Sequence, residues 1–459
     1  MQKIEAAIEK AIKFRKYNAL ITETFDLAIQ QAYTALQHGL QPFPIVVKDC
    51  YTFRNVRTTC GSKMLENYIS PYSATVVKRL TESGGCIIGK ANMDEFCMGT
   101  SSSSSYFGPV KNGFSEFNRL DNDWLIPGGS SGGSAVSVQL GFADVALGSD
   151  TGGSSRNPAA FTGTFGFKPS YGVLSRHGLI PLVNSLDCPA LITKNARECN
   201  FYFKNLVGKD SNDAASINAP SSCFIQNREL SNITIGIPEE FFNDSLSQSS
   251  WNAWNDAAKA LAKLGCKVKK VSMPHIEYSI ICYHVIAETD ISSNMARYDG
   301  VAYGHRSKNT FSTHEMYASG RSEALGEVVR RRILAGNFFL LKRYFAHVNK
   351  YFTRALKVRR LIKQDFDRVF REQNCSALLT PVTIGTPPLA SQMKEGNYER
   401  ERSEDFYTQP ANMAGIPACS VPFVKTEDGL SIAVQIMSDH LQDGIVLQIA
   451  DQLEKYSYS

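Results

Sequence analysis

The chain has 459 residues, of which 43% are hydrophobic and 20% are charged, which is the composition of a globular protein. It contains no run of about 18 apolar residues, so the sequence predicts no membrane-spanning helix. The net charge of +5 is mild for this length, and total charge gives no argument for nucleic-acid binding. The length fits one large α/β enzyme domain or two lobes.

The cysteine pattern bears on metal binding and on the redox compartment. Eleven cysteines, from Cys50 to Cys419, form no C-x-x-C pair and have no histidine at zinc-finger spacing. We therefore expect no metal site and, with an odd count, reduced thiols in an intracellular compartment. Glu5 and Glu9 lie among the lysines of the first twenty residues, which weakens the case for a transit peptide.

The first half of the chain has the pattern of an α/β protein. Residues 1–40 alternate charged and apolar positions at helical spacing, which predicts two amphipathic helices. Short apolar or β-branched runs then predict strands at 44–49, 85–91, 144–150, 162–170 and 188–194, with a helix at 72–83. This alternation indicates a central sheet with helices packed against it.

From about residue 200 the pattern changes. We expect, in chain order, a polar loop at 211–222, a strand at 232–238, a helix at 251–265, a long basic helical region at 322–373, a strand at 376–383 and a last helix at 441–456. In the helix at 251–265, Trp251, Trp254, Ala258 and Leu261 fall on one face, and Gly265 ends it. No internal repeat is present.

One stretch imitates a nucleotide-binding motif. The sequence GGCIIGKA, from Gly84 to Ala91, nearly matches the phosphate-binding pattern G-x-x-x-x-G-K-[ST]. Ala91 replaces the hydroxyl residue that holds Mg²⁺ in that pattern, and the letters CII put apolar strand formers where the loop belongs. We interpret this stretch as a strand with a glycine turn.

Two stretches of Gly and Ser interrupt the apolar runs: PGGSSGGSAVSV, from Pro127 to Val138, and GSDTGGSSRNPAA, from Gly148 to Ala160. A flexible loop is one interpretation. The alternative is a pair of anion-binding turns, in which backbone N–H groups converge because no Cβ blocks the approach. With a serine at its end, such a turn supplies a nucleophile and an oxyanion hole together.

A hydroxyl nucleophile needs a base, and Lys48 is the candidate. It ends the apolar run PFPIVV, where partial desolvation disfavours its charged form. The alternative is a lysine that reaches solvent from a strand end. The eight histidines lie in settings that do not indicate a catalytic base. A Ser–Ser–Lys arrangement needs none of them.

Lys48, GGSSGG and SDTGGSSR, in this order and spacing, resemble the amidase signature family, and MDEFCMGTSSSSSYFGPVKN resembles its subfamily of tRNA-dependent amidotransferase glutaminase chains. The resemblance covers nearly the whole chain and is densest from about residue 43 to 190. It implies an α/β, amidase-signature-type fold with a central mixed sheet covered on both faces by helices. It also implies a single domain, 1–459, with a catalytic core in 1–200 and substrate recognition in 201–459.

The resemblance implies a Ser–cisSer–Lys triad. In this triad Ser154 is the nucleophile, Ser130 is the bridging serine after a cis peptide bond from Gly129, and Lys48 is the terminal base. The implied oxyanion donors are backbone N–H groups, those of Thr151, Gly152, Gly153 and Ser154. We expect Asp150, which precedes the turn, to fix the loop by accepting hydrogen bonds.

Substrate choice is implied for the second half of the chain. By the same resemblance, Arg332 binds the α-carboxylate of glutamine, Asp405 binds its α-amino group, and Tyr303 lies close by. A guanidinium suits a carboxylate and a carboxylate suits an ammonium, so the chemistry agrees. The alternative for Arg332 is one more member of a solvated basic run.

The function implied is that of a glutaminase subunit, which hydrolyses glutamine so that its ammonia converts Glu-tRNA(Gln) to Gln-tRNA(Gln). The implied partners are a subunit that binds and activates the tRNA, and a third small subunit. The chain then contacts tRNA only indirectly and needs no cofactor or metal of its own, since ATP and Mg²⁺ act at the partner. Ser155 and the run Ser101–Ser105 depart from the family pattern in a way that resembles mitochondrial versions. We therefore expect the mitochondrial matrix, with the cytoplasm as the alternative.

Two other functions stay open at this point. One is a stand-alone amidase acting on another small amide, and the other is a non-catalytic scaffold in a translation complex. An apolar amide would leave Arg332 and Asp405 buried without partners, which is costly. A scaffold has no need of an intact Lys48, Ser130 and Ser154.

Overall fold

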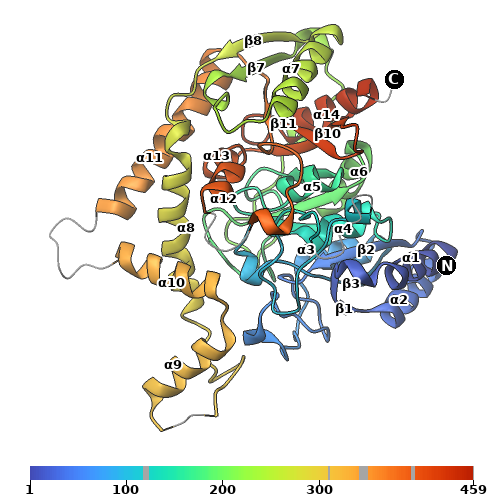
Figure 1. Cartoon of the computed structure of the whole chain (residues 1–459). Coiled ribbons are helices and arrows are strands. Elements are labelled where there is room, and N and C mark those ends of the chain that lie inside the picture. The colour runs from blue at the N-terminus through green and yellow to red at the C-terminus, as the bar shows by residue number, and fades with distance from the viewer. Residues whose placement is uncertain (117–122, 309–310, 341–349, 394–397, 458–459) are drawn as a thin grey trace.

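The computed structural model of the chain describes residues 1–116, 123–308, 311–340, 350–393 and 398–457. The strands of this part are β1 (Leu20–Glu23), β2 (Phe43–Lys48), β3 (Gly85–Ala91), β4 (Val145–Asp150), β5 (Phe165–Lys168), β6 (Cys188–Thr193), β7 (Thr234–Pro238), β8 (Lys267–Val271), β9 (Ala377–Pro381), β10 (Ala418–Lys425) and β11 (Ser431–Met437). They form one sheet in the order β1-β3-β2-β4-β6-β5-β10-β11-β9-β7-β8 (Figure 1). Because β2 pairs with β4 in parallel and β4 pairs with β6 antiparallel, the sheet is mixed, as predicted.

The α-helices of the described residues surround this sheet. They are α1 (Gln2–Lys13), α2 (Phe25–Gln37), α3 (Thr75–Glu82), α4 (Gly132–Gln139), α5 (Arg156–Thr162), α6 (Ala196–Leu206), α7 (Gln248–Lys263), α8 (Ser279–Met295), α9 (Thr313–Ala324), α10 (Glu327–Leu340), α11 (Lys350–Asp367), α12 (Tyr398–Asp405), α13 (Gln409–Ala414) and α14 (Asp443–Ser457). In Figure 1, α9 and α10 project away from the body of the molecule.

Helices cover both faces of the central strands. Val46 of β2 and Ala146 of β4 belong to a cluster that includes residues of α1, α2 and α4. Val47 and Leu147, one position further along each strand, belong to a second cluster that includes residues of α3 and α6. Since successive side chains of a strand point to opposite faces, these helices lie on opposite sides of the sheet, as the resemblance implied.

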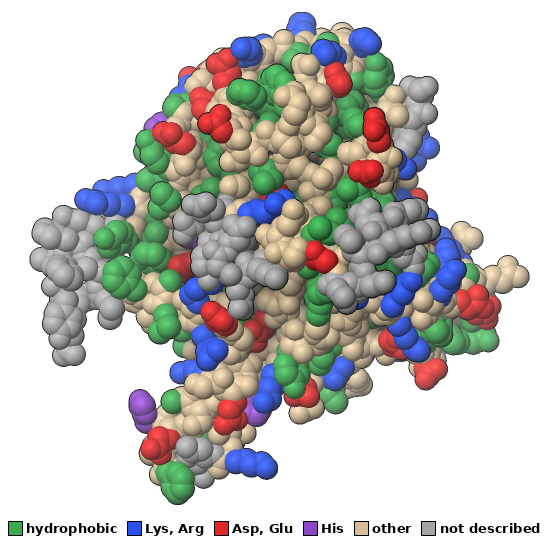
Figure 2. All heavy atoms as spheres, viewed as in Figure 1, with side chains coloured by type: hydrophobic (Ala, Val, Ile, Leu, Met, Phe, Trp, Pro, Cys, Tyr) green, Lys and Arg blue, Asp and Glu red, His purple; other side chains and the backbone are tan. Residues whose placement is uncertain are grey.

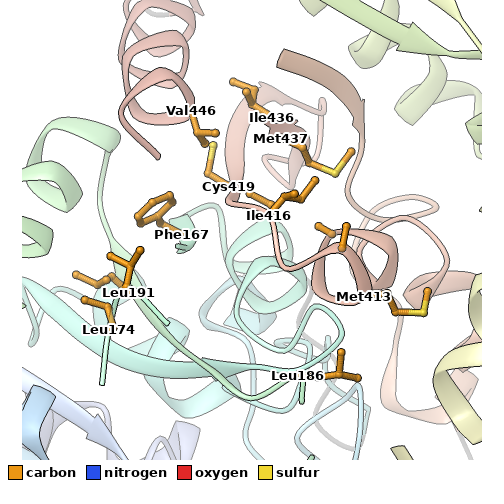
Figure 3. Close-up of a cluster of buried hydrophobic side chains, with 14 of the residues drawn as sticks. Phe167, Leu174, Leu186, Leu191, Met413, Ile416, Cys419, Ile436, Met437 and Val446 are labelled. Carbon is orange, nitrogen blue, oxygen red and sulfur yellow. The ribbon is translucent and has the colours of Figure 1, made fainter. Parts of the chain in front are cut away.

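The second cluster joins the two halves of the chain. Figure 3 shows Phe167 and Leu191 in the same buried region as Cys419, Ile436 and Val446. Full burial of an aliphatic or aromatic side chain contributes about 1.5–3 kcal/mol. The predicted division at residue 200 therefore does not coincide with a gap in the core, and the assignment of roles to the two parts stays a prediction.

Most predicted elements are present. The two N-terminal helices are α1 and α2, the strand patterns correspond to β2 to β7 and β9, and the false P-loop is β3, buried throughout. The helix expected at 251–265 is α7, in which Trp254 and Leu261 are buried and Trp251 packs against the same cluster. Gly265 follows it with φ +106°, a conformation that suits glycine at a helix end.

Four strands were not predicted, and the reasons differ. The exposed edge strand β8 has the sequence KVKKV, whose lysines hide its apolar alternation and protect the edge from pairing with another chain. Strand β10 contains Pro422, which lies where the register with β11 shifts. The pattern overlooked β1 and β11 as well.

The helical region expected at 322–373 is divided. It contains the end of α9, then α10 and α11, and residues 341–349 between the last two lie outside the described residues. Leu325 ends α9 with an extended backbone conformation. The prediction of a continuous helix was therefore wrong at this position.

Surface charge is mixed on the face shown in Figure 2, where Lys and Arg side chains lie among Asp and Glu side chains. This agrees with the small net charge of the sequence. Among the residues that the structure describes, no helix is both long and apolar enough to cross a membrane.

Candidate active site

The site is built at the ends of two adjacent parallel strands, β2 and β4. Lys48 is the last residue of β2, and its side chain is completely buried. Its Nζ lies 2.7 Å from Ser130 Oγ and 2.9 Å from Ser149 Oγ. The structure thus brings Lys48 and Ser130 together as predicted, and adds Ser149, which the sequence did not single out.

The loop before α4 holds Ser130 in an unusual backbone conformation. The peptide bond between Gly129 and Ser130 is cis. Ser102 fastens both ends of this loop, because its Oγ donates to Gly128 O at 2.8 Å and accepts from Gly132 N at 3.0 Å. The serine run that departs from the family pattern therefore supports the loop that carries Ser130.

The turn after β4 carries Ser154 and is joined directly to the Ser130 loop. Ser131 N donates to the backbone oxygen of Ser154 at 3.0 Å. Ser154 is half-buried, whereas its neighbours in the turn are buried. In the described residues, no hydrogen bond joins Ser130 Oγ to Ser154 Oγ, so the structure places the two serines on adjoining loops without a direct side-chain contact.

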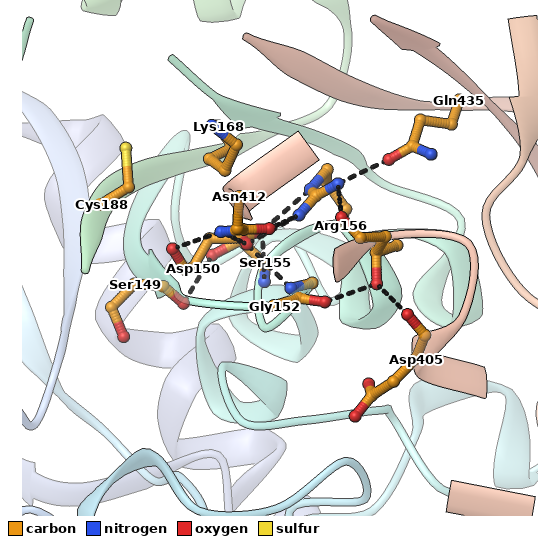
Figure 4. Close-up of polar contacts among 12 residues, drawn as sticks. Ser149, Asp150, Gly152, Ser155, Arg156, Lys168, Cys188, Asp405, Asn412 and Gln435 are labelled. Atoms are coloured by element: carbon orange, nitrogen blue, oxygen red, sulfur yellow. Dashed lines mark hydrogen bonds and ion pairs between the residues drawn. The ribbon is translucent and has the colours of Figure 1, made fainter. Parts of the chain in front are cut away.

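Asp150 fixes this turn, as predicted. Its carboxylate accepts from Gly153 N at 2.9 Å and from Ser155 N at 3.2 Å (Figure 4). Arg156, also fully buried, pairs with it at 2.9 Å. Burial opposes the ionisation of Asp150, but the charge and hydrogen bonds of Arg156 outweigh it and hold the pKa of this carboxyl well below its usual range.

Arg156 is a functional residue that the sequence analysis missed. Its guanidinium donates to Thr408 O at 2.9 Å and to Gln435 Oε1 at 2.6 Å, besides its contacts with Asp150 and Asn412. The available signal was its place directly after the Gly/Ser turn. It ties the turn to α13 and β11, which come from the far end of the chain.

One predicted oxyanion donor needs correction. The N–H of Gly153 is taken by Asp150, so it holds the turn and is not available to a substrate oxygen. The N–H groups of Thr151, Gly152 and Ser154 donate to no other described residue. These three stay predicted donors.

The two glycines of the turn are required by close approaches. A Cβ on Gly152 would lie 2.9 Å from the ring of Tyr283, and a Cβ on Gly153 would lie 2.2 Å from Thr408 Oγ1. Gly153 also has φ +134°, a conformation that other residues rarely adopt. The turn is bare because side chains from the second half of the chain pack onto it.

A family model described as Amidase matches residues 2–447. The chain belongs to the amidase family. Two curated relatives, from Xenopus tropicalis and Ixodes scapularis, are both named as the mitochondrial glutamyl-tRNA(Gln) amidotransferase chain of type A. The first is 43% identical and covers 97% of this chain and 90% of that protein, and the second is 46% identical and covers 90% and 82%.

Solved structures give the same family. The crystal structure of the type A chain of glutamyl-tRNA(Gln) amidotransferase from Thermotoga maritima has a TM-score of 0.79 and 34% identity, covering 99% of this chain and 91% of that one. A 6-aminohexanoate cyclic dimer hydrolase has a TM-score of 0.81 at 20% identity, which shows the fold alone. Amidase-family sheets with different substrates thus share this architecture.

Two predicted substrate residues of this amidase lie near the turn. Burial raises the pKa of Tyr283, the charge of Arg332 lowers it, and the charge of Asp405 raises it, so both charges act on the ring that covers Gly152. Thr408, three residues after Asp405, donates from Oγ1 to Gly152 O at 2.6 Å and from N to Asp405 O at 3.2 Å. Arg332 is half-buried on α10, which packs against α8.

Tyr303 is placed elsewhere. Its ring lies against Tyr68 and Tyr298, with centroids 6.2 and 6.1 Å away, and it is 42% exposed. In the described part of the chain, no contact joins it to Tyr283 or to the turn. Its role in binding substrate stays a prediction.

The departure at Ser155 is accommodated inside the amidase core. This residue is fully buried, and its Oγ donates to Ser149 O at 3.2 Å and lies 3.4 Å from Ser131 Oγ. A Cβ on Gly148 would lie 2.5 Å from the same oxygen. The hydroxyl replaces apolar packing with a hydrogen bond between the two loops, so local packing does differ, as expected.

Glu95 anchors the helix that carries Arg332. Its carboxylate accepts from Gly326 N, just before α10, at 2.8 Å and from Ser62 Oγ at 2.5 Å. Burial raises the pKa of Glu95 to about 7, although both hydrogen bonds lower it. A buried acid of this kind favours the protonated form of the folded protein.

This anchor predicts a pH dependence of stability. Because its pKa is raised in the folded state, Glu95 stabilises the protein below about pH 4.5, and that contribution is lost as pH rises through about 7. We expect Glu95→Gln to remove a slope that approaches about 1.4 kcal/mol per pH unit in this window. Urea unfolding of both proteins from pH 5 to 8 measures it, and parallel curves would contradict the prediction.

Proposed function

We propose that this amidase-family chain is the glutaminase subunit of a tRNA-dependent amidotransferase. It hydrolyses glutamine to glutamate and ammonia, and the ammonia converts Glu-tRNA(Gln) to Gln-tRNA(Gln). The names of the relatives and of the Thermotoga maritima structure support this proposal. The observation that carries it is the 2.7 Å contact between the buried Lys48 and Ser130, on a loop joined to the Ser154 turn.

The proposed mechanism is a relay of protons between the three side chains. Neutral Lys48 accepts the proton of Ser130 while Ser130 accepts that of Ser154, whose oxygen attacks the amide carbon of glutamine. The C–N bond then breaks, and the proton returns through Ser130 to the leaving nitrogen, which departs as ammonia. Water hydrolyses the resulting ester on Ser154 by the same relay and releases glutamate.

The developing negative charge is held by the turn. The N–H groups of Thr151, Gly152 and Ser154 are the proposed donors, and each donor in such a site is typically worth around 3 kcal/mol. Asp150 and Arg156 keep the turn rigid from behind, so the donors need no rearrangement when the oxyanion forms. Rigid placement is what makes such donors effective.

Arg332 and Asp405 are the proposed contacts for the two charged groups of glutamine. We expect Arg332→Ala to raise KM for glutamine by about 100-fold, because it removes a charge-assisted contact worth about 1.5–3 kcal/mol. For an amide that lacks the α-carboxylate, KM should change by less than about threefold. Steady-state ammonia release from both substrates measures this, and equal increases would remove Arg332 from the site.

The partner subunits are proposed from the same relatives. They are a subunit that binds tRNA and activates Glu-tRNA(Gln) with ATP and Mg²⁺, and a third, small subunit. Ile281 on α8 and Leu334 on α10 are each 71% exposed, and Phe338 is 58% exposed, which suits a protein interface. The mitochondrial matrix is the proposed location, in line with the names of the relatives.

The complex with its partners tests the whole proposal. Given glutamine, ATP, Mg²⁺ and Glu-tRNA(Gln), it should form Gln-tRNA(Gln) and one glutamate for each product. Free ammonium chloride should replace glutamine as the nitrogen source. Product from ammonium chloride alone, with none from glutamine, would show that this chain does not supply the ammonia.

A further inference from the structure

Lys48 makes a contact that the proposed relay does not use. Besides Ser130, its Nζ donates to Ser149 Oγ at 2.9 Å. Ser149 is the residue before Asp150 on β4 and is 6% exposed. Figure 4 shows it at the end of that strand, beside the turn.

Two thiols hold the Ser149 hydroxyl. Cys97 Sγ lies 3.5 Å from Ser149 Oγ, and the Cys50 thiol donates to the same oxygen across 3.8 Å. A hydroxyl has one donor and two acceptor positions. Lys48 and Cys50 fill the acceptor positions, which leaves the Ser149 O–H directed at Cys97.

The electrostatics agree with this arrangement. A hydrogen bond from Cys50 lowers the pKa of Cys97 to about 6 against the effect of burial, and Lys48 lowers it further. Cys97 is thus a good acceptor for the Ser149 O–H. Every hydrogen-bonding position of Ser149 is occupied, and its oxygen is fixed.

No carboxylate does this for Lys48. Asp49, its neighbour in sequence, pairs with Lys90 at 2.7 Å, and Asp150 pairs with Arg156 at 2.9 Å. In the described residues Lys48 has no acidic group within 4 Å, and a fully buried ammonium ion without one is costly. The two serines are its only described hydrogen-bond partners.

A neutral amine has two N–H donors and one lone pair, and rotation about the Cε–Nζ bond exchanges their directions. Only the lone pair can accept the proton of Ser130. A fixed acceptor for one N–H stops this rotation, and 2.9 Å is a normal length for such a bond. The lone pair is then free to face Ser130 at 2.7 Å.

We infer that Ser149 is a positioning residue, which takes one N–H of Lys48 so that the lone pair of the amine faces Ser130. This inference rests on the proposed function, since it assigns Lys48 the role of base. Ser149 touches neither substrate nor nucleophile, and acts through Lys48 alone.

The test is Ser149→Ala in the complete complex, with ammonia release from glutamine followed from pH 5 to 9. We expect kcat to fall by about 10- to 100-fold with KM for glutamine within about threefold, because misdirection of a reacting group slows chemistry and not binding. The loss of an acceptor also disfavours the ammonium form of Lys48. The acid limb of kcat should therefore move to lower pH by about one pH unit.

Three further variants make the result specific. Ser149→Thr keeps the hydroxyl and should restore kcat to within about threefold of wild type. Ser149→Cys keeps the volume but is a poor acceptor, so it should shift the limb like alanine and serves if the alanine variant does not fold. Ser134→Ala removes a buried hydroxyl that donates to Leu147 O of the same strand at 2.9 Å, and should leave the limb in place.

Ser154→Ala, measured beside them, separates the two proposals. If it still releases ammonia, the proposed function fails. If it is inactive while Ser149→Ala keeps both the acid limb and kcat of wild type, only the positioning role is overturned. The same holds if Ser134→Ala reproduces the shift.

Discussion

Ser154→Ala is expected to lower glutamine-dependent ammonia release by at least about 1000-fold, because no other residue can form the acyl intermediate. The half-buried Ser154 stands on a turn whose other residues are buried, so the substitution removes one hydroxyl and leaves the surrounding hydrogen bonds in place. The backbone oxygen of residue 154 still accepts from Ser131. Ammonia release by the purified complex measures the effect.

The control for this variant is ammonium chloride. A complex with Ser154→Ala should still form Gln-tRNA(Gln) from free ammonia at the wild-type rate, since the acceptor chemistry takes place on the partner. Loss of both reactions would indicate a damaged complex and would require the folding of the variant to be checked by its melting temperature. Undiminished release from glutamine in this variant would contradict the assignment of Ser154.

The parts of the site that the sequence predicts are those carried by short contiguous segments. Lys48, Ser130 and Ser154 each lie at the end of a strand or at the start of a helix, and parallel strands bring such ends to one edge of a sheet. The direction of a single N–H is a different matter. Whether Gly153 faces the substrate or Asp150 depends on where the Asp150 carboxylate lies, and residue spacing alone does not fix that position.

Contacts between distant segments also escaped prediction. Arg156 meets Thr408 and Gln435 across 252 and 279 residues of sequence, and nothing in the local pattern near Arg156 indicates either partner. Tyr283 packs on Gly152 from a helix whose own sequence is mostly apolar and reads as core. Such pairs become visible only when the sheet order is known.

Arg156→Ala is expected to have the largest effect on stability. It leaves Asp150 buried without its counter-ion, and removal of one partner of a buried pair costs about 3–5 kcal/mol. The hydrogen bonds from Arg156 to Thr408 and Gln435 are lost as well, which detaches α13 and β11 from the turn. We expect a lower melting temperature and a fall in ammonia release at temperatures where the fold persists.

Arg15→Ala is the matched control for Arg156→Ala. Arg15 also pairs with a carboxylate through two hydrogen bonds, both to Glu23 at 2.6 Å, but its side chain is 57% exposed. Exposed pairs contribute no more than about 1 kcal/mol, so this variant should melt close to wild type. Equal losses in the two variants would mean that burial of the Asp150–Arg156 pair is not what makes it important.

A double variant separates the charge of Asp150 from its hydrogen bonds. Asp150→Asn together with Arg156→Met removes both charges and keeps an oxygen that can accept from Gly153 N. Since most of the cost of Arg156→Ala comes from the uncompensated carboxylate, the double variant should be more stable than Arg156→Ala. If it is less stable, the contacts of Arg156 with the second half of the chain outweigh its pairing with Asp150, and the pair acts mainly as a tether between the two parts of the sheet.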